Sequence, residues 1–187
     1  VTMGFNIPVI EMAGYEADDL IGTMARRGEA QGFLVVIVTG DKDFIQMVSE
    51  RVVIWDPMKE RTIDLSFVRE NFGVAPEKMI EVMGFSGDTS DNVPGVPGIG
   101  PKTALQLIKT FGTMERLYQQ VDSITAKKQH ENLVAFRDQA FLSRDLVTIR
   151  TDAPISLDPR DLAKKEPDNE KLSALFKILE FSRLQQS

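Results

Sequence analysis

Seven acidic residues fall into three short groups along this sequence, and such groups could do chemistry on a phosphate. The groups are Glu16, Asp18 and Asp19; Asp41 and Asp43; and Asp88 and Asp91. Like charges a few ångströms apart repel one another by several kcal/mol at an effective dielectric constant of about 20. If the three groups converge, they need divalent cations, and carboxylate oxygens are the ligands that Mg²⁺ and Mn²⁺ prefer.

Each acidic group has an ordinary structural explanation when it is taken alone. Acids in the first turn of a helix complement the helix dipole, which would account for residues 16–19. An aspartate after a strand is often a loop residue, and Asp88 and Asp91 could form a turn and a helix cap. The combination of all three groups is what favours a metal site over these separate explanations.

Composition restricts the chemistry further. The 187 residues include no cysteine and a single histidine, His130, which excludes thiolate metal sites and disfavours a zinc site or a Ser–His–Asp triad. The net charge of −6 is opposite to the usual balance of nucleic-acid-binding proteins. Acids neutralised by bound cations would still leave a basic surface for phosphate contact, so both readings stay open. No apolar run approaches the roughly 20 residues that cross a bilayer, and no signal peptide is evident, so we expect a cytoplasmic protein with no membrane partner.

The elements around the first two acidic groups predict a parallel sheet. The apolar run 7–10 predicts a strand, residues 17–25 have helical apolar spacing, and 33–38 is a continuous apolar run typical of a buried parallel strand. This order predicts a βαβ unit with a right-handed crossover. The first helix begins where one strand ends, and Asp41 follows the end of the next. Both acidic groups should therefore lie at the carboxyl edge of the sheet, where open α/β folds bind ligands.

The rest of the chain changes from strands to helices near residue 66. Strands at 52–55 and 62–65 flank a turn at 57–60, after a short helix at 44–48. Helices are predicted at 66–72, 76–84, 101–111, 113–118, 127–142 and 170–181, with an extended segment at 146–149 and a proline-spaced connector at 154–167.

A glycine-rich bend at 95–100 joins helices 76–84 and 101–111. Gly98 and Gly100 let backbone N–H groups approach a phosphate, and the start of the next helix adds the positive end of its dipole. Lys102 and Lys109 share a face that could follow a DNA backbone, which positions a duplex without reading its sequence. A plain tight turn and ordinary surface lysines are the alternatives. The residues predicted to bind DNA are Gly95, Val96, Gly98, Ile99, Gly100, Lys102, Thr103 and Lys109.

Two other phosphate-handling classes match less well. A P-loop needs a lysine directly after its last glycine, and Pro101 intervenes here, so we reject an NTPase. A haloacid-dehalogenase-type phosphatase also has Asp-x-Asp after a strand. It normally has Thr or Val two residues later, where this chain has Ile45.

Three motifs, in order, carry a family resemblance: GYEADDLIG at 14–22, TGDKD at 39–43 and GDTSDNVPGVPGIGPKTA at 87–104. They resemble the flap endonuclease family, specifically the 5′→3′ exonuclease domain of bacterial DNA polymerase I, and the likeness extends to residues 179–181. The resemblance implies an α/β fold: an incomplete parallel, PIN/Rossmann-like sheet with helices, then a helix–hairpin–helix region and C-terminal helices. The expected parts are 1–75, the C-terminal part of the α/β nuclease core; 76–125, the helix–hairpin–helix DNA-binding region; and 126–187, C-terminal helices packing back on the core.

The resemblance also implies a function. It implies a structure-specific nuclease that acts on 5′ flaps, nicks and 5′ ends of duplex DNA by a two-metal mechanism with Mg²⁺ or Mn²⁺. By motif position, Glu16, Asp18 and Asp19 would hold or orient the first ion, and Asp41, Asp43, Asp88 and Asp91 would serve the second. Asp18, Asp41, Asp43 and Asp91 are the residues expected to be catalytic. The hairpin around Gly98 and Gly100 would hold the duplex, with K⁺ as a candidate ion at its carbonyls.

One departure from the family pattern affects activity. The family begins with a strand that carries a metal-binding aspartate, followed by a second aspartate and a basic helical arch, and these would precede Val1. We therefore expect a fragment without roughly the first third of the domain, which binds duplex DNA but cleaves it weakly or not at all. We further expect a monomer from a bacterial, nucleoid-associated protein, with a linked polymerase domain as a candidate partner. The alternative is a non-catalytic helix–hairpin–helix DNA-binding module that retains its acids for structural reasons.

Overall fold

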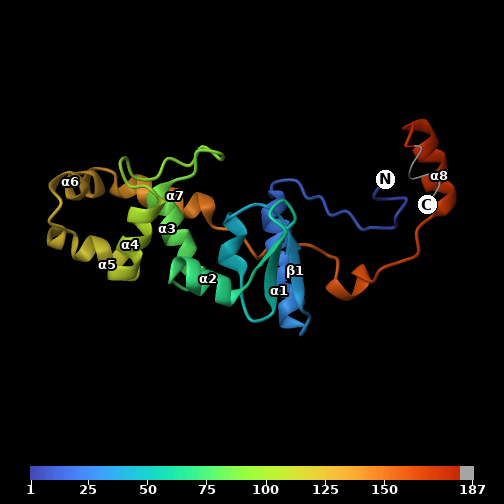
Figure 1. Cartoon of the computed structure of the whole chain (residues 1–187), viewed down its shortest axis with the longest axis horizontal. Helices are drawn as coiled ribbons and strands as arrows, with labels where there is room; N and C mark the ends of the chain where they lie inside the picture. Colours follow the sequence, from blue (N-terminus) through green and yellow to red (C-terminus); the bar gives the residue numbers. More distant parts are fainter. Residues whose placement is uncertain (182–187) are drawn as a thin grey trace.

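A three-stranded mixed sheet forms the centre of the first half of the molecule. The computed structural model describes residues 1–181. Strand β1 (Val35–Val38) pairs in parallel with β2 (Val52–Asp56), and β2 pairs antiparallel with β3 (Arg61–Ile63), in the order β1–β2–β3. Helix α1 (Ala17–Ala30) packs against β1 (Figure 1), where Gly28 lies against the Val35 side chain. The Asp43–Met47 3₁₀ helix, η1, follows β1 and completes the core of the sheet through Phe44 and Ile45.

The second half consists of short helices with defined ends. They are α2 (Leu65–Phe72), η2 (Pro76–Lys78), α3 (Met79–Ser86), α4 (Pro101–Phe111), α5 (Met114–Gln119), η3 (Val121–Ser123), α6 (Lys127–Ala135) and α7 (Arg137–Val147). Asp64 accepts a hydrogen bond from the Phe67 amide at 2.8 Å and so caps the start of α2. Thr113 caps α5 in the same way. Gly73 ends α2 with φ of 66°, a conformation that glycine adopts without strain.

Two main apolar clusters form the core. One surrounds the sheet and includes Phe44, Val52 and Ile54, and it also takes in Val68 of α2 and Met79 of α3. The other lies among α3 to α7 and includes Phe85, Met114, Leu117 and Leu133, all essentially without solvent exposure. Helices α3 and α7 approach closely, because Gly84 leaves room for the Arg144 backbone and the Ala140 carbonyl. The helical cluster is therefore built around an α3–α7 pair.

The chain after α7 returns to the sheet half and then reaches a terminal lobe. Along α1, the Ala153 amide donates to Thr23 Oγ1 at 3.1 Å, and Arg27 donates to the Ala153 carbonyl at 3.0 Å. The chain then passes through η4 (Pro159–Leu162) to α8 (Asn169–Ile178). Helix α8 packs on the N-terminal segment at one end of the molecule (Figure 1), where the Phe5 and Phe176 rings are 6.4 Å apart. The expected division at 75 and 125 stays a prediction.

Five sequence-based expectations about elements were wrong. Residues 7–10 form no strand. Pro8 lacks an N–H donor, and Ile7 and Val9 are exposed with no neighbouring strand among residues 1–181. The βαβ unit expected from that strand is therefore absent from the described residues. β1 is parallel but is an edge strand, with Val36 and Val38 exposed.

The other two corrections concern the C-terminal helices. The helix predicted at 127–142 is two helices, because the backbone leaves the helical conformation at Phe136. Residues 146 and 147, expected to be extended, form the last turn of α7. Among residues 1–181, no helix has the length and apolar character that a bilayer crossing requires.

Candidate acidic centre and adjoining hairpin

Carboxylates from the three acidic groups converge on one cavity of about 250 Å³. The acids that line it are Glu16, Asp18, Asp19, Asp41, Asp43 and Asp91. They come from the start of α1, from the loop and 3₁₀ helix after β1, and from the loop after α3. The structure therefore brings together the acids that the sequence places up to about 75 residues apart.

Glu16 and Asp19 take part in the start of α1. They form a capping box, in which Asp19 Oδ2 accepts from the Glu16 amide at 3.4 Å. Asp19 Oδ1 also accepts from the Arg150 amide at 2.8 Å, which ties the chain after α7 to the rim of the cavity. Asp18 makes no such local bond. Its pKa is raised by partial burial and by the neighbouring charges of Asp41 and Glu16.

Asp43 is the most buried of the carboxylates that line the cavity. It is only 8% exposed, and its Oδ1 atom is buried without a hydrogen-bond partner. Burial, followed by the charges of Asp41 and Asp88, raises the pKa of Asp43 to about 6. Asp41 shapes the turn before it, because Asp41 Oδ1 accepts from the Asp43 amide at 2.9 Å. A buried carboxylate oxygen with no donor is the feature that a bound cation would satisfy.

Asp88 sits beside the cavity and is tied to it by Lys42. The Lys42 ammonium lies 2.8 Å from Asp88 Oδ2, while Asp88 Oδ1 accepts from the Ser90 amide at 2.8 Å. Burial raises the pKa of Asp88, but these two partners outweigh it, so the net shift is downward. Oxygens of Asp43, Asp88 and Asp91 lie within 4.8 Å of one another. Lys42 is a residue that sequence reasoning passed over, since its partner lies far along the chain.

The donor set fits a hard divalent cation. It consists of carboxylate oxygens, and one of them is buried and unpartnered. Glu16, Asp19, Asp41 and Asp88 already accept hydrogen bonds from the protein, whereas no side-chain hydrogen bond of Asp18, Asp43 or Asp91 is found among residues 1–181. Asp91 is exposed and faces the cavity without a side-chain hydrogen bond among residues 1–181.

The glycine-rich bend directly follows the acidic loop. Gly87 and Gly95 are packed so closely that a Cβ on Gly95 would lie 2.3 Å from the Gly87 nitrogen, and Gly95 has φ of 59°. Val96 and Ile99 turn inward and are 3% exposed, so they anchor the bend in the helical core. Gly98 and Gly100 lie at its surface, and Pro101 begins α4. The N–H groups at the start of α4 are thus presented to solvent.

The two predicted DNA-binding lysines differ in their surroundings. Lys102 lies exposed in the first turn of α4, as does Thr103 in part. Lys109, in the last turn, has its ammonium against Gly73 at the C-terminus of α2, where a Cβ would lie 2.9 Å from it. The structure therefore places Lys102 beside the bend, and Lys109 at the seam between α2 and α4.

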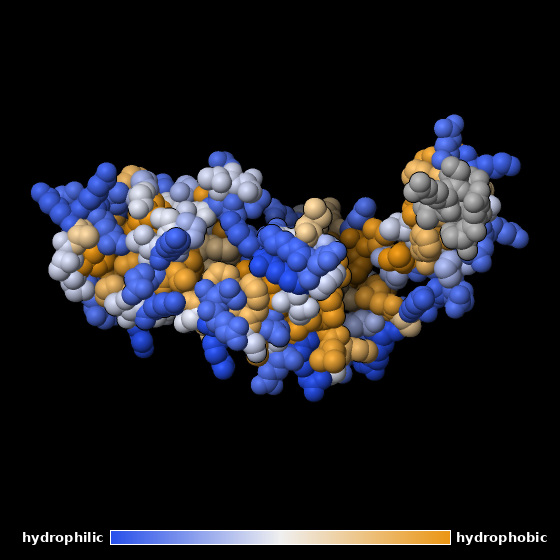
Figure 2. All heavy atoms as spheres, in the orientation of Figure 1, coloured by the Kyte–Doolittle hydropathy of each residue, from blue (hydrophilic) through white to orange (hydrophobic). Residues whose placement is uncertain are grey.

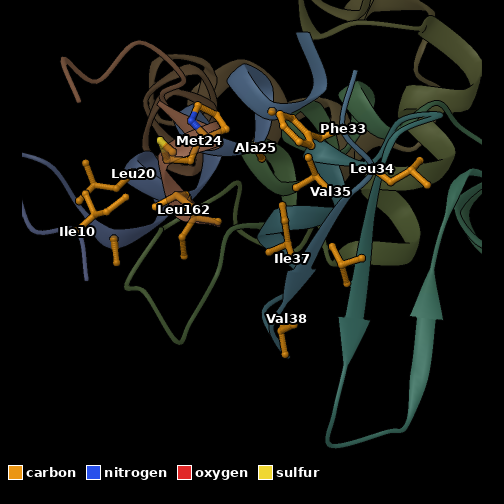
Figure 3. Close-up of a pocket in the computed structure, with 15 residues that line it drawn as sticks. Ile10, Leu20, Met24, Ala25, Phe33, Leu34, Val35, Ile37, Val38 and Leu162 are labelled. Atoms are coloured by element: carbon orange, nitrogen blue, oxygen red, sulfur yellow. The ribbon is translucent and has the colours of Figure 1, made fainter. Parts of the chain in front are cut away.

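A large apolar groove lies in the sheet half. It has a volume of about 880 Å³ and runs between α1 and β1 (Figure 3), where Leu20, Met24, Val35 and Ile37 line it. Apolar surface over α1 and β1 is also visible in Figure 2. This groove is larger than the acidic cavity, but it contains no titratable side chain and offers no chemistry on a phosphate.

An acidic centre at a sheet edge, followed by a helix–hairpin–helix, defines the class of 5′ nucleases. Solved structures of this class resemble the chain. T5 5′-exonuclease with bound divalent metal ions (zinc) is 26% identical over 77% of this chain and 54% of that one, with a TM-score of 0.70. The catalytic core of Rad2 in complex with DNA substrate covers 95% of this chain and 60% of that one, at 19% identity and a TM-score of 0.63, and shows the fold alone.

Sequence comparison identifies the particular family. Residues 74–170 match the model of the 5′-3′ exonuclease C-terminal SAM fold, and residues 1–73 match its N-terminal resolvase-like domain. The chain belongs to the 5′-3′ exonuclease family. Relatives include DNA polymerase I of Rhizobium leguminosarum, 46% identical over 98% of this chain, and of Bacillus caldotenax, 44% identical over 95%. The chain spans about a fifth of their length, 18% and 21%.

Proposed function

We propose that this chain belongs to the 5′ nuclease of a DNA polymerase I, which hydrolyses phosphodiesters at 5′ flaps, nicks and 5′ ends of duplex DNA, and that the chain alone binds duplex DNA but cleaves it weakly or not at all. The convergence of six carboxylates on one cavity, with the buried and unpartnered oxygen of Asp43 among them, carries the proposal. Membership of the 5′-3′ exonuclease family supports it. So does the 46% identity to a DNA polymerase I, of which this chain spans 18%.

Asp18, Asp41, Asp43 and Asp91 are proposed to hold two divalent ions, Mg²⁺ or Mn²⁺. The ions, when bound, would activate water and neutralise charge on the phosphate during in-line displacement. Glu16 and Asp19 orient this set from the first turn of α1, and Asp88 does so through its ion pair with Lys42. The protein's own contribution is thus a cavity on which the carboxylates of all three acidic groups converge.

The bend at 95–100 is proposed to hold the duplex downstream of the cut. The N–H groups at the start of α4 and the Lys102 ammonium can contact phosphates without reading sequence. K⁺ at the carbonyls of the bend remains part of the proposal. The carbonyls of Gly95, Val96, Pro97 and Gly100 each accept a hydrogen bond from the protein, so K⁺ would use their second lone pairs.

Cleavage of a 5′-end-labelled flap duplex tests the proposal. The assay compares this chain with the complete polypeptide encoded by the same reading frame. We expect the complete polypeptide to cut only when Mg²⁺ or Mn²⁺ is present. Asp91→Ala should reduce cutting by at least about 100-fold while duplex binding is retained. Cutting that persists in Asp91→Ala, or in excess EDTA, would contradict the proposal. Binding without any metal-dependent cutting by the complete polypeptide would instead favour a non-catalytic DNA-binding module.

A further inference from the structure

Gly95, the residue that joins the acidic loop to the bend, has both of its peptide groups held by α7. Its N–H donates to Ser143 Oγ at 3.0 Å, and its carbonyl accepts from Gln139 Nε2 at 2.6 Å. Ser143 is completely buried, so this N–H has no access to water as an alternative partner. Helix α7 therefore fixes the orientation of the peptide planes on either side of Gly95.

A third side chain holds the bend two residues later. Asn132 of α6 donates to the Pro97 carbonyl at 2.8 Å, and its Nδ2 atom lies against Gly98. The bend is thus held at Gly95 and Pro97 by side chains that lie 35 to 48 residues further along the chain. None of the three holding residues is charged, and none belongs to a motif that the sequence displays.

The helix that carries Gln139 and Ser143 packs on the helix that precedes the acidic loop. Helix α7 packs tightly on α3 at Gly84, and the acidic loop begins where α3 ends, at Ser86. Asp88 and Asp91 therefore lie in the loop that directly follows α3. The bend is held by side chains of α7, the helix that packs on α3. Any duplex on the bend has its distance from the acids set by this one rigid unit.

We propose that Gln139 and Ser143, with Asn132, are positioning residues that hold the DNA-binding bend in register with the acidic centre. This inference rests on the proposed function, since it takes the bend to be the duplex-binding element. The three residues make no phosphate contact themselves. They act by keeping Gly95 to Pro97 in the one conformation that presents the start of α4.

The test compares Gln139→Ala and Ser143→Ala with Gln119→Ala, a matched control on α5. Gln119 is exposed and makes no side-chain hydrogen bond among residues 1–181. Amide hydrogen exchange should accelerate by about 10-fold or more at Gly95 and Val96 in both variants, and not in the control. The Kd for a fluorescein-labelled duplex should rise by roughly 3- to 10-fold. Gln139→Glu should fail to rescue, because a carboxylate cannot donate to the Gly95 carbonyl.

The salt dependence of binding separates positioning from contact. The slope of log Kd against log salt concentration should stay unchanged in Gln139→Ala, whereas Lys102→Ala should lower it by about one. Unaltered exchange at Gly95 and Val96, or exchange that accelerates equally throughout α3 to α7, would overturn the inference. A wild-type chain that binds no duplex would refute the proposed function, while the exchange data would still decide whether α7 holds the bend.

Discussion

The sheet half and the helical half of this molecule differ in how completely they bury their apolar side chains. Among α3 to α7, Leu117 and Leu133 are 0% exposed at the centre of the helical cluster. In the sheet half, Leu34 and Val38 are 77% and 65% exposed, and β1 leaves a groove open along α1. The acidic centre lies where the halves meet, between the start of α1, the loop after β1 and the loop after α3. The helical half thus offers a buried base for the acidic loop and the bend, whereas the face of β1 stays open.

The largest effect should come from Gly95→Ala. A Cβ there would lie 2.3 Å from the Gly87 backbone nitrogen, at φ of 59°, so the acidic loop and the bend cannot both keep their places. We expect a loss of more than about 4 kcal/mol in the free energy of unfolding, measured by urea denaturation. Gly32→Ala is the control, since Gly32 has φ of 86° but open space around it, and should lose only about 1 kcal/mol. Similar losses in the two variants would show that the close approach at Gly95 is unimportant.

The comparison itself is tested by one substitution in each half. Leu133→Ala removes a fully buried side chain from the helical cluster and should cost about 2–5 kcal/mol. Val36→Ser changes a side chain of the open β1 face that is 56% exposed and should cost under about 1 kcal/mol. Both are measured by urea denaturation. A large loss in Val36→Ser would mean that the β1 face is covered in solution.

Asp43→Asn should stabilise the chain in the absence of divalent ions. The pKa of Asp43 is raised to about 6, above its ordinary value of 3.8, so the fold disfavours the ionised form. The penalty grows as pH rises from about 4 to about 6 and is complete at pH 7. We expect Asp43→Asn to raise Tm by a few degrees at pH 7.5 in EDTA, measured by calorimetry.

The control for this effect is Asp138→Asn, on the exposed surface of α7. It should leave Tm nearly unchanged, and added Mg²⁺ should raise the Tm of the wild-type chain more than that of Asp43→Asn. An Asp43→Asn variant that is less stable than the wild type in EDTA would contradict the view of Asp43 as an uncompensated buried charge.

The smallest effect concerns the Lys42–Asp88 ion pair, which joins the two acid-bearing loops. Lys42→Met leaves a buried Asp88 carboxylate with one backbone donor, so we expect a loss of about 1 kcal/mol in urea denaturation. Lys59→Met should lose less, because its partner Asp56 keeps Arg61 and two backbone donors. Equal losses would indicate that the Asp88 pair is an ordinary surface ion pair.

Features that depend on neighbouring residues in the chain could be predicted from local signals in the sequence. Thr113 caps the start of α5, Gly73 ends α2, and the bend at 95–100 follows from its glycines. The convergence of the acids followed from the rule that ligand sites lie at the carboxyl ends of parallel strands. That rule succeeded even though residues 7–10 are not a strand, because Asp18 is placed by α1 packing on β1.

Features that depend on distant partners could not be predicted from the sequence. The exposure of Val36 depends on what packs beside β1, which an apolar run does not encode. The break at Phe136 interrupts a helical pattern that continues in sequence on both sides. Ser143 and Gln139 hold Gly95 across 48 and 44 residues, and no spacing rule links such positions. The acids of the centre were therefore predictable, and the side chains that hold its loops were not.

The most direct test of the account is an amide NMR titration of this chain with Mn²⁺, whose paramagnetism broadens nearby signals. If the acidic centre binds divalent ions, signals of residues 41–43, then of Asp18 and Asp91, should broaden first, at substoichiometric Mn²⁺. An Asp43→Ala, Asp91→Ala double variant should lose this selectivity. Broadening that is no stronger at these residues than at exposed acids such as Asp138, or that survives in the double variant, would contradict the central claim.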